Sequence, residues 1–240
     1  MNNETSFRQI TAITAILAAV LNVASTIIPL MALDFNFEFL ADPGELLTAG
    51  LEPSAIELFH WGSVLVVFGW CLLFIPAALY LWFWLKPHSP GLVTLYTVLG
   101  LTGIVFCALV SAIGASFWPP MMAAYPQAAE AQREVLEVVF RAVTDFAFEG
   151  MYALNSILFG FWWLGIGLVL RVERRTLGIA TAIMGVAILG AGIGWTFRVH
   201  PLARLEAFYF FEPIWAIWLG IVIWRRGEQG DHGMDGLAAT

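Results

Sequence analysis

Glu212 is the residue whose position most directly suggests chemistry, because it lies within a long apolar stretch and is followed by Pro213. Counting back from Trp224 at about 1.5 Å per helical residue places Glu212 about 18 Å from one end of that stretch. If the stretch crosses a hydrocarbon layer about 30 Å thick, this carboxyl group lies inside the layer. It should then meet a donor or water, or be protonated. The alternative is that the helix begins at Pro213 and Glu212 caps it at the interface.

A second polar side chain, Asn155, lies at a comparable depth by the same count, about 23 Å from the inner end of its own apolar stretch. Asn155 is therefore a candidate hydrogen-bond partner of Glu212. Glu149, His60 and Arg198 belong to the same end of the predicted helices, and an arginine there can extend its side chain toward the interior. Together these five residues predict a polar ligand pocket.

Glu57 and His60 form an E-x-x-H pair, which places both side chains on one face of a helix. Metal sites in helical bundles use two such pairs with further carboxylates, and only one pair occurs here. With His200 it gives a candidate metal-ligand set, and His60 and His200 are also a candidate haem pair. Glu57 has a structural explanation too, since Ser54-Ala-Ile-Glu57 fits a capping box that opens a helix. The sequence identifies no cofactor.

The elements that must position these residues are six long apolar stretches in a chain of 240 residues that is 60% hydrophobic and 12% charged. Soluble domains carry roughly 25% charged residues, and about 20 apolar residues suffice to cross a bilayer. The sequence therefore predicts an all-α polytopic membrane protein, a six-transmembrane-helix bundle forming one domain over residues 1–240. The predicted spans are residues 10–33, 56–85, 91–118, 151–170, 177–197 and 207–224.

Residues 128–148 have helical periodicity with Val135, Val139 and Phe146 on one face, and they predict an outer amphipathic helix that runs into the fourth span. The third and fifth spans carry small residues at every fourth position, including Gly103 in one and Gly190 in the other. Such stripes predict close packing of these two helices, either inside the bundle or across a dimer seam.

The positions of basic residues predict the topology, because cytoplasmic loops carry an excess of arginine and lysine. Seven of the eleven basic residues fall at one set of helix ends and four at the other. The larger set is Arg8, Lys86, Arg171, Arg174, Arg175, Arg225 and Arg226. Both termini are therefore predicted to be cytoplasmic. The net charge of −7 argues against a nucleic-acid partner.

Two apolar motifs, Asn155-Ser-Ile-Leu-Phe-Gly160 and Pro213-Ile-Trp-Ala-Ile-Trp-Leu-Gly220, resemble segments of a bacterial six-span membrane protein family known only as a domain of unknown function. The likeness in layout covers residues 10–226. It implies the fold and a bacterial inner membrane location, and it implies no activity.

The function that these features favour is non-enzymatic: a bundle that binds a lipid-like molecule, or an accessory or scaffold subunit of a membrane complex. Membrane lipids, other membrane subunits or a second copy of the chain are then the expected partners. The alternative is a membrane-embedded enzyme with a carboxylate and histidine site, with or without a metal ion, near the extracytoplasmic face.

Overall fold

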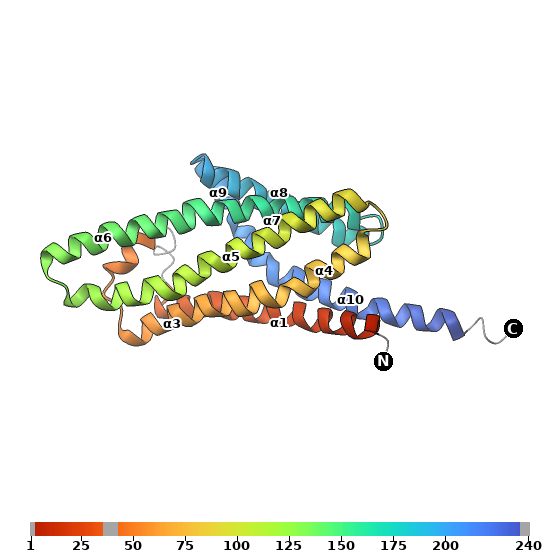
Figure 1. Ribbon diagram of the computed structural model, residues 1–240, viewed down its shortest axis with the longest axis horizontal. Coiled ribbons are helices and arrows are strands. Elements are labelled where there is room, and N and C mark those ends of the chain that lie inside the picture. The colour runs from red at the N-terminus through yellow and green to blue at the C-terminus, as the bar shows by residue number, and fades with distance from the viewer. Residues whose placement is uncertain (1–2, 36–42, 236–240) are drawn as a thin grey trace.

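The computed structural model describes residues 3–35 and 43–235, and these form a bundle of long helices (Figure 1). No strand occurs in this described part. In chain order the elements are α1 (Asn3–Ala32), η1 (Pro43–Leu47), α3 (Pro53–Leu65), η2 (Val66–Leu72), α4 (Leu73–Leu85), α5 (Pro90–Ala124), η3 (Tyr125–Gln127), α6 (Glu130–Asp145), η4 (Phe146–Tyr152), α7 (Ala153–Leu170), α8 (Arg175–Thr196), α9 (His200–Ala203), η5 (Arg204–Phe211) and α10 (Glu212–Asp235).

Six helical runs in the described residues are long and apolar enough to cross a membrane, which confirms the predicted all-α architecture. They are Glu4–Ala32, Pro53–Leu85, Pro90–Gln127, Glu130–Leu170, Arg175–Thr196 and His200–Arg226. The fourth run is longer than the predicted span, because the amphipathic helix α6 continues through η4 into α7 without a break. The chain is therefore a multi-pass membrane protein.

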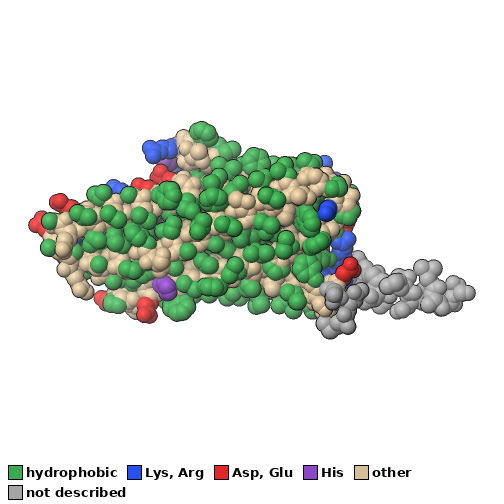
Figure 2. All heavy atoms as spheres, viewed as in Figure 1, with side chains coloured by type: hydrophobic (Ala, Val, Ile, Leu, Met, Phe, Trp, Pro, Cys, Tyr) green, Lys and Arg blue, Asp and Glu red, His purple; other side chains and the backbone are tan. Residues whose placement is uncertain are grey.

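The two ends of the bundle differ in the charges they carry. Both chain termini lie at one end, which we call the terminal end, and the opposite end is formed by the turn between α5 and α6, which we call the α6 end (Figure 1). Hydrophobic side chains cover the long sides of the visible face, with acidic side chains concentrated toward the α6 end (Figure 2). Val135 and Val139 of α6 and Phe146 of η4 point outward, with 61%, 41% and 63% of each residue exposed. The predicted apolar face thus lies on the outside of the bundle, and α6 packs inward through Phe140, which is completely buried.

The closest helix contact joins α7 and α8 through glycines on both helices. A methyl group placed on Gly160 would lie 2.5 Å from the backbone nitrogen of Leu189, and one on Gly185 would collide with the backbone of Leu164. Backbone contact of this kind requires small residues. The stripe of α5 also packs against α7, since Gly103 contacts Phe159. The predicted packing of the third span on the fifth is therefore wrong: the third packs on α7 through Gly103, and Gly190 of the fifth faces Leu205 of η5.

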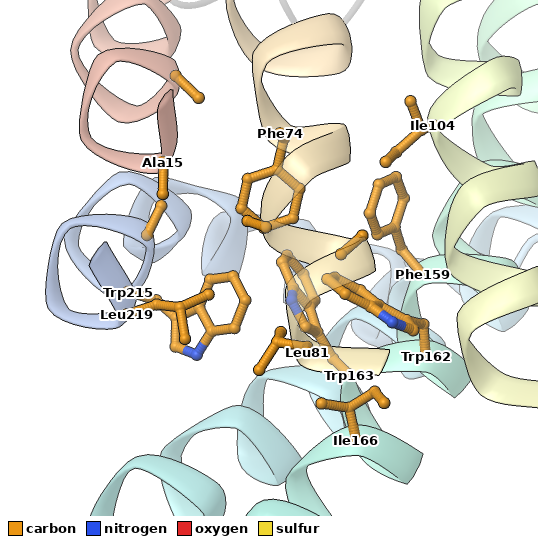
Figure 3. Packing of buried hydrophobic residues seen from close by; sticks show 14 of the residues in the cluster. Ala15, Phe74, Leu81, Ile104, Phe159, Trp162, Trp163, Ile166, Trp215 and Leu219 are labelled. Atoms are coloured by element: carbon orange, nitrogen blue, oxygen red, sulfur yellow. The ribbon is translucent and has the colours of Figure 1, made fainter. Parts of the chain in front are cut away.

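The centre of the bundle is filled by aromatic side chains from four helical segments (Figure 3). Trp162 and Trp163 of α7 are completely buried, and Phe74 of α4 meets Trp162 edge to face with ring centroids 5.8 Å apart. Trp70 of η2 stacks on Phe74 at 4.7 Å, and Trp215 of α10 packs against both α7 tryptophans. This aromatic core closes the middle of the bundle.

Candidate functional site

A cavity of about 1090 Å³ lies in the half of the bundle toward the α6 end, and it is partly open to the exterior. All six spans contribute to its wall. Trp70 and Phe159 belong both to this wall and to the aromatic core, so the core forms the closed base of the cavity. Most of the lining is apolar, and the polar side chains are few and come from separate helices.

Three helical segments with irregular hydrogen bonding supply much of the wall. The π-helical turns η2 and η4 contribute Trp70 and Tyr152, and the 3₁₀ segment η5 contributes Tyr209. Such turns interrupt an α-helix and frequently mark functional sites. Each such turn rotates the residues that follow it about the helix axis. Large aromatic side chains therefore point into the cavity, whereas a regular α-helix would direct them elsewhere. The two tyrosine rings lie 5.5 Å apart.

Glu212 lies in the interior of the bundle, with 5% of the residue exposed, and it lines the cavity. The α-helical geometry of α10 begins at Glu212, but the chain before it is already helical as η5, so the residue sits within a continuous helical run. Its hydrogen-bond donor is Asn22 of α1, with Nδ2 3.5 Å from Oε2. Asn155 was the predicted partner, and Asn22 was not foreseen. An amide in the middle of the first apolar stretch was the signal that could have found it.

Asn155 is also buried in the cavity wall, with 1% of the residue exposed. Its Oδ1 atom makes no hydrogen bond. A methyl group added to Gly103 would lie 3.5 Å from this oxygen, so the glycine leaves the space beside it open. A buried carbonyl oxygen without a partner is costly, and a group that enters the cavity could satisfy it.

Acidic side chains surround the route from the exterior to Glu212. Glu149 of η4 lines the cavity, and its Oε2 lies 3.7 Å from Nη2 of Arg198. The Arg198 side chain is 84% exposed and pairs with Glu149 at the rim. The prediction that this arginine extends into the pocket is therefore wrong. Deeper in the wall, Glu206 accepts a hydrogen bond of 2.9 Å from the indole nitrogen of Trp195.

The predicted histidine ligands do not join this cavity. His60 of α3 lies outside its wall, and Nδ1 donates to the carbonyl oxygen of Ala115 at 2.8 Å. Glu57 and His200 are exposed. Among the residues that the structure describes, no group of three or more His, Cys, Asp or Glu side chains could hold a metal ion, so the set Glu57, His60 and His200 is not assembled.

The capping box predicted around Glu57 is wrong. Helix α3 begins at Pro53. A backbone N–H in the first turn of a helix has no partner within that helix, so the missing N–H of proline costs nothing there. Glu52 occupies the N-cap position and its side chain makes no capping hydrogen bond. Glu57 lies about one turn after the start of α3, and its carboxylate is exposed.

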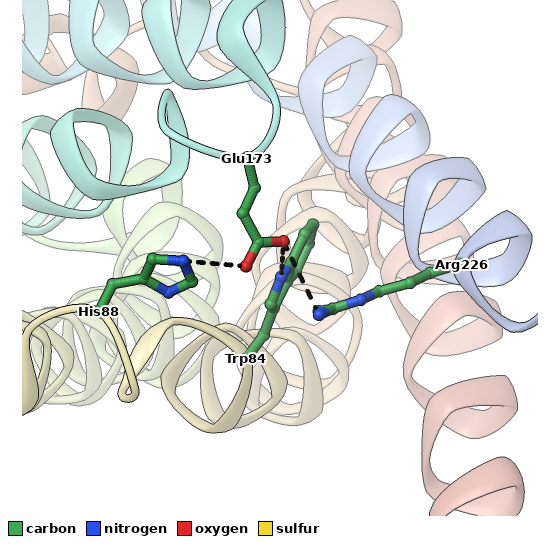
Figure 4. A network of polar contacts seen from close by, with 4 residues as sticks. All are labelled: Trp84, His88, Glu173 and Arg226. Atoms are coloured by element: carbon green, nitrogen blue, oxygen red, sulfur yellow. Dashed lines mark hydrogen bonds and ion pairs between the residues drawn. The ribbon is translucent and has the colours of Figure 1, made fainter. Parts of the chain in front are cut away.

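The terminal end of the bundle holds a different polar cluster, centred on Glu173 in the turn between α7 and α8 (Figure 4). Glu173 accepts a hydrogen bond of 2.6 Å from the indole nitrogen of Trp84. Its two carboxylate oxygens also lie 3.2 Å from Nε2 of His88 and 3.7 Å from Nη2 of Arg226. The Arg226 guanidinium stacks on the Trp84 ring at 4.3 Å. One carboxylate thus connects α4, the turn before α5, and α10.

Comparison of the chain with protein-family models, with curated proteins and with solved structures found no match. The resemblance to a bacterial six-span family therefore stays a prediction. Any function must be argued from the cavity and the side chains that line it.

Proposed function

We propose that this membrane protein binds a lipid-like amphiphile in the cavity, with the polar head group at Glu212 and Asn155 and the apolar tail along the aromatic wall. The observation that carries the proposal is the combination of an apolar cavity of about 1090 Å³ with two buried polar side chains that the protein itself satisfies poorly. Binding sites for small molecules have this composition: apolar walls and a few placed polar groups.

The size of the cavity favours a ligand with a single hydrocarbon chain. Sites for small molecules usually measure about 300–1000 Å³, and this cavity, at about 1090 Å³, is slightly larger than that range. The lining continues from the rim acids on η4 to the aromatic core, which is the arrangement an elongated molecule with one polar end requires. The head would lie beside Glu212 and the tail against rings such as Trp70 and Phe159.

A channel or an enzyme is less well supported by the same geometry. The aromatic core fills the bundle between the cavity and the terminal end, and a permeation path would need polar groups or water along that route. The enzyme alternative required histidines beside the carboxyl groups, and both His60 and His200 lie outside the cavity wall. A binding function needs none of these groups.

We further propose that both termini face the cytoplasm of a bacterial cell and that the cavity lies toward the extracytoplasmic side. The support is the excess of basic residues at the terminal end. A cysteine introduced at the exposed Thr48 should react with a membrane-impermeant thiol reagent in intact cells, and one at Val172, which is 70% exposed, should react only after lysis. The native Cys71 and Cys107 are buried and define the background. The reverse labelling pattern contradicts the orientation.

The experiment that tests binding fills the cavity without touching its acidic floor. Ser111 of α5 lines the cavity, whereas Ser116 on the same helix is exposed and its hydroxyl bonds its own backbone at Ala112. Native mass spectrometry of purified protein should show a retained amphiphile in the unmodified chain and in Ser116→Phe, and loss of it in Ser111→Phe. Equal retention in both variants, or no retained molecule in any sample, would contradict the proposal.

A further inference from the structure

Two hydrogen-bond acceptors at the floor of the cavity have little or no protein partner, and these acceptors indicate the chemistry of the head group. Asn155 Oδ1 has no partner, and the Glu212 carboxyl group has one long contact, to Asn22. Both side chains are more than nine-tenths buried. A ligand that completes this site must therefore bring hydrogen-bond donors.

Several donors in the wall are already engaged with protein acceptors. The indole N–H of Trp118 bonds Thr144, that of Trp195 bonds Glu206, and the Tyr209 hydroxyl bonds Ser156. The hydroxyl of Ser25, beside Asn22, donates to that residue's own carbonyl oxygen at 2.7 Å. The Ser63 and Ser111 hydroxyls can donate or accept, so they set no preference. A ligand with only acceptors, such as a ketone or an ester, would leave Asn155 Oδ1 unsatisfied.

The charge of the lining favours a cation over a neutral donor. Of the ionisable aspartate, glutamate and arginine side chains in the wall, four are acids and one is basic: Asp145, Glu149, Glu206 and Glu212 against Arg141. Arg198 neutralises one rim acid, Glu149, from outside the wall. The acids lie from the exposed rim, through the half-buried Glu206, to the buried floor, so an ammonium group meets a carboxyl group at each depth of the route.

Aromatic rings strengthen the preference, because the faces of tryptophan and tyrosine attract cations. Trp70, Tyr152 and Tyr209 all line the cavity that contains Glu212. On the basis of the proposed lipid-binding function, we infer that the cavity selects an amphiphile with a single alkyl chain and a protonated amine head. The ammonium N–H groups donate to Glu212 and to Asn155 Oδ1, and the chain lies against the aromatic base. A trimethylammonium head has the charge but no N–H group, so it cannot satisfy Asn155.

Competition between amphiphiles of equal chain length tests this inference on the unmodified protein. The probes are tetradecylamine, tetradecanol, tetradecanoate, tetradecyltrimethylammonium and an ethanolamine lysophospholipid with a tetradecanoyl chain, offered together and resolved by native mass spectrometry. The amine should occupy the cavity about 10- to 100-fold more than the alcohol, since a charge-assisted hydrogen bond is worth roughly that factor. Binding of tetradecanol, tetradecanoate or tetradecyltrimethylammonium as tightly as the amine overturns the inference, whereas the ethanolamine lysophospholipid carries the same ammonium donors on a single chain and its binding supports it.

Three variants locate the effect. Glu212→Gln should reduce amine binding to the level of the alcohol, and Asn155→Leu should reduce the advantage of the amine over the trimethylammonium compound. Glu134→Gln removes an exposed carboxylate of α6 outside the cavity wall and should change neither ratio. If Glu212→Gln does not fold, the probe series on the unmodified protein still decides the inference.

The two proposals fail in distinguishable ways. Binding of several probes without preference for the amine leaves the lipid-binding function standing and overturns the choice of head group. Failure of every probe to bind, together with no retained molecule in the Ser111→Phe comparison, overturns the function itself.

Discussion

The two ends of the bundle differ in how many partners surround a central carboxyl group. At the terminal end a single carboxylate, Glu173, has Trp84, His88 and Arg226 around it, and neighbouring helices meet at backbone distance. At the α6 end, Glu212 has one long contact and Asn155 Oδ1 has none, beside a cavity of about 1090 Å³. The first arrangement holds helices together, and the second leaves space and unsatisfied acceptors for a ligand. The polar cluster that connects helices and the candidate binding site thus lie at opposite ends of the same helices.

The largest expected effect comes from forcing volume into the α7–α8 contact. Gly185→Leu places a side chain where the Leu164 backbone already lies, and overpacking costs about 3 kcal/mol or more when backbone must move. The thermal unfolding temperature in detergent should fall sharply, or no folded protein should be recovered. Gly91→Leu, with no atom within 4 Å of the added carbon, is the matched control and should change little. Similar melting of both variants would show that the contact is not tight.

A smaller effect of opposite sign is expected at the cavity floor. Glu212→Leu should stabilise ligand-free protein by about 1–2 kcal/mol, because it removes a buried carboxyl group that has a single weak partner. Glu206→Leu provides the contrast: it removes the acceptor of the Trp195 indole N–H and should lower stability by about the same amount. Thermal unfolding after removal of bound lipid measures both. A destabilising Glu212→Leu would mean that the carboxyl group serves structure, which would make the two ends of the bundle alike.

The smallest expected effect concerns the Glu173 cluster. Glu173→Ala should lower stability by about 1 kcal/mol, because the side chain is 28% exposed and solvent weakens its ion pairs, leaving the Trp84 hydrogen bond as the main loss. Amphiphile binding should be unchanged, since the cluster lies at the opposite end from the cavity. Glu134→Ala on the exposed surface of α6 controls for loss of a negative charge. Weaker binding in Glu173→Ala would show that the two ends are coupled.

Much of the layout could be predicted from local sequence. Runs of apolar residues predicted six spans, and the ends of the six helical runs differ from the predicted ends by nine residues or fewer, apart from the start of the fourth, where the predicted amphipathic helix joins it. Counting residues from Trp224 placed Glu212 inside the sixth run, and the structure shows it buried in the bundle. These quantities depend on position along the chain alone.

Which residues face each other could not be predicted in the same way. In a membrane the outside of a bundle is as apolar as its inside, so apolar periodicity does not show which face is buried. Val135, Val139 and Phe146 illustrate this, since the structure places them on the exterior. The same ambiguity hid the packing of Gly103 against α7 and of Gly190 against η5.

Six apolar helical runs, the unequal charge of the two ends and the place of a carboxyl group within the sixth run are therefore properties of the sequence. Packing in three dimensions established that Asn22 rather than Asn155 donates to Glu212, that His60 turns to a backbone carbonyl, and that aromatic side chains from η2, η4 and η5 enclose one cavity. The physical reason is the rotation of side chains about the helix axis. Each π or 3₁₀ turn changes the direction in which later side chains point, and only the packed neighbours determine where those turns occur.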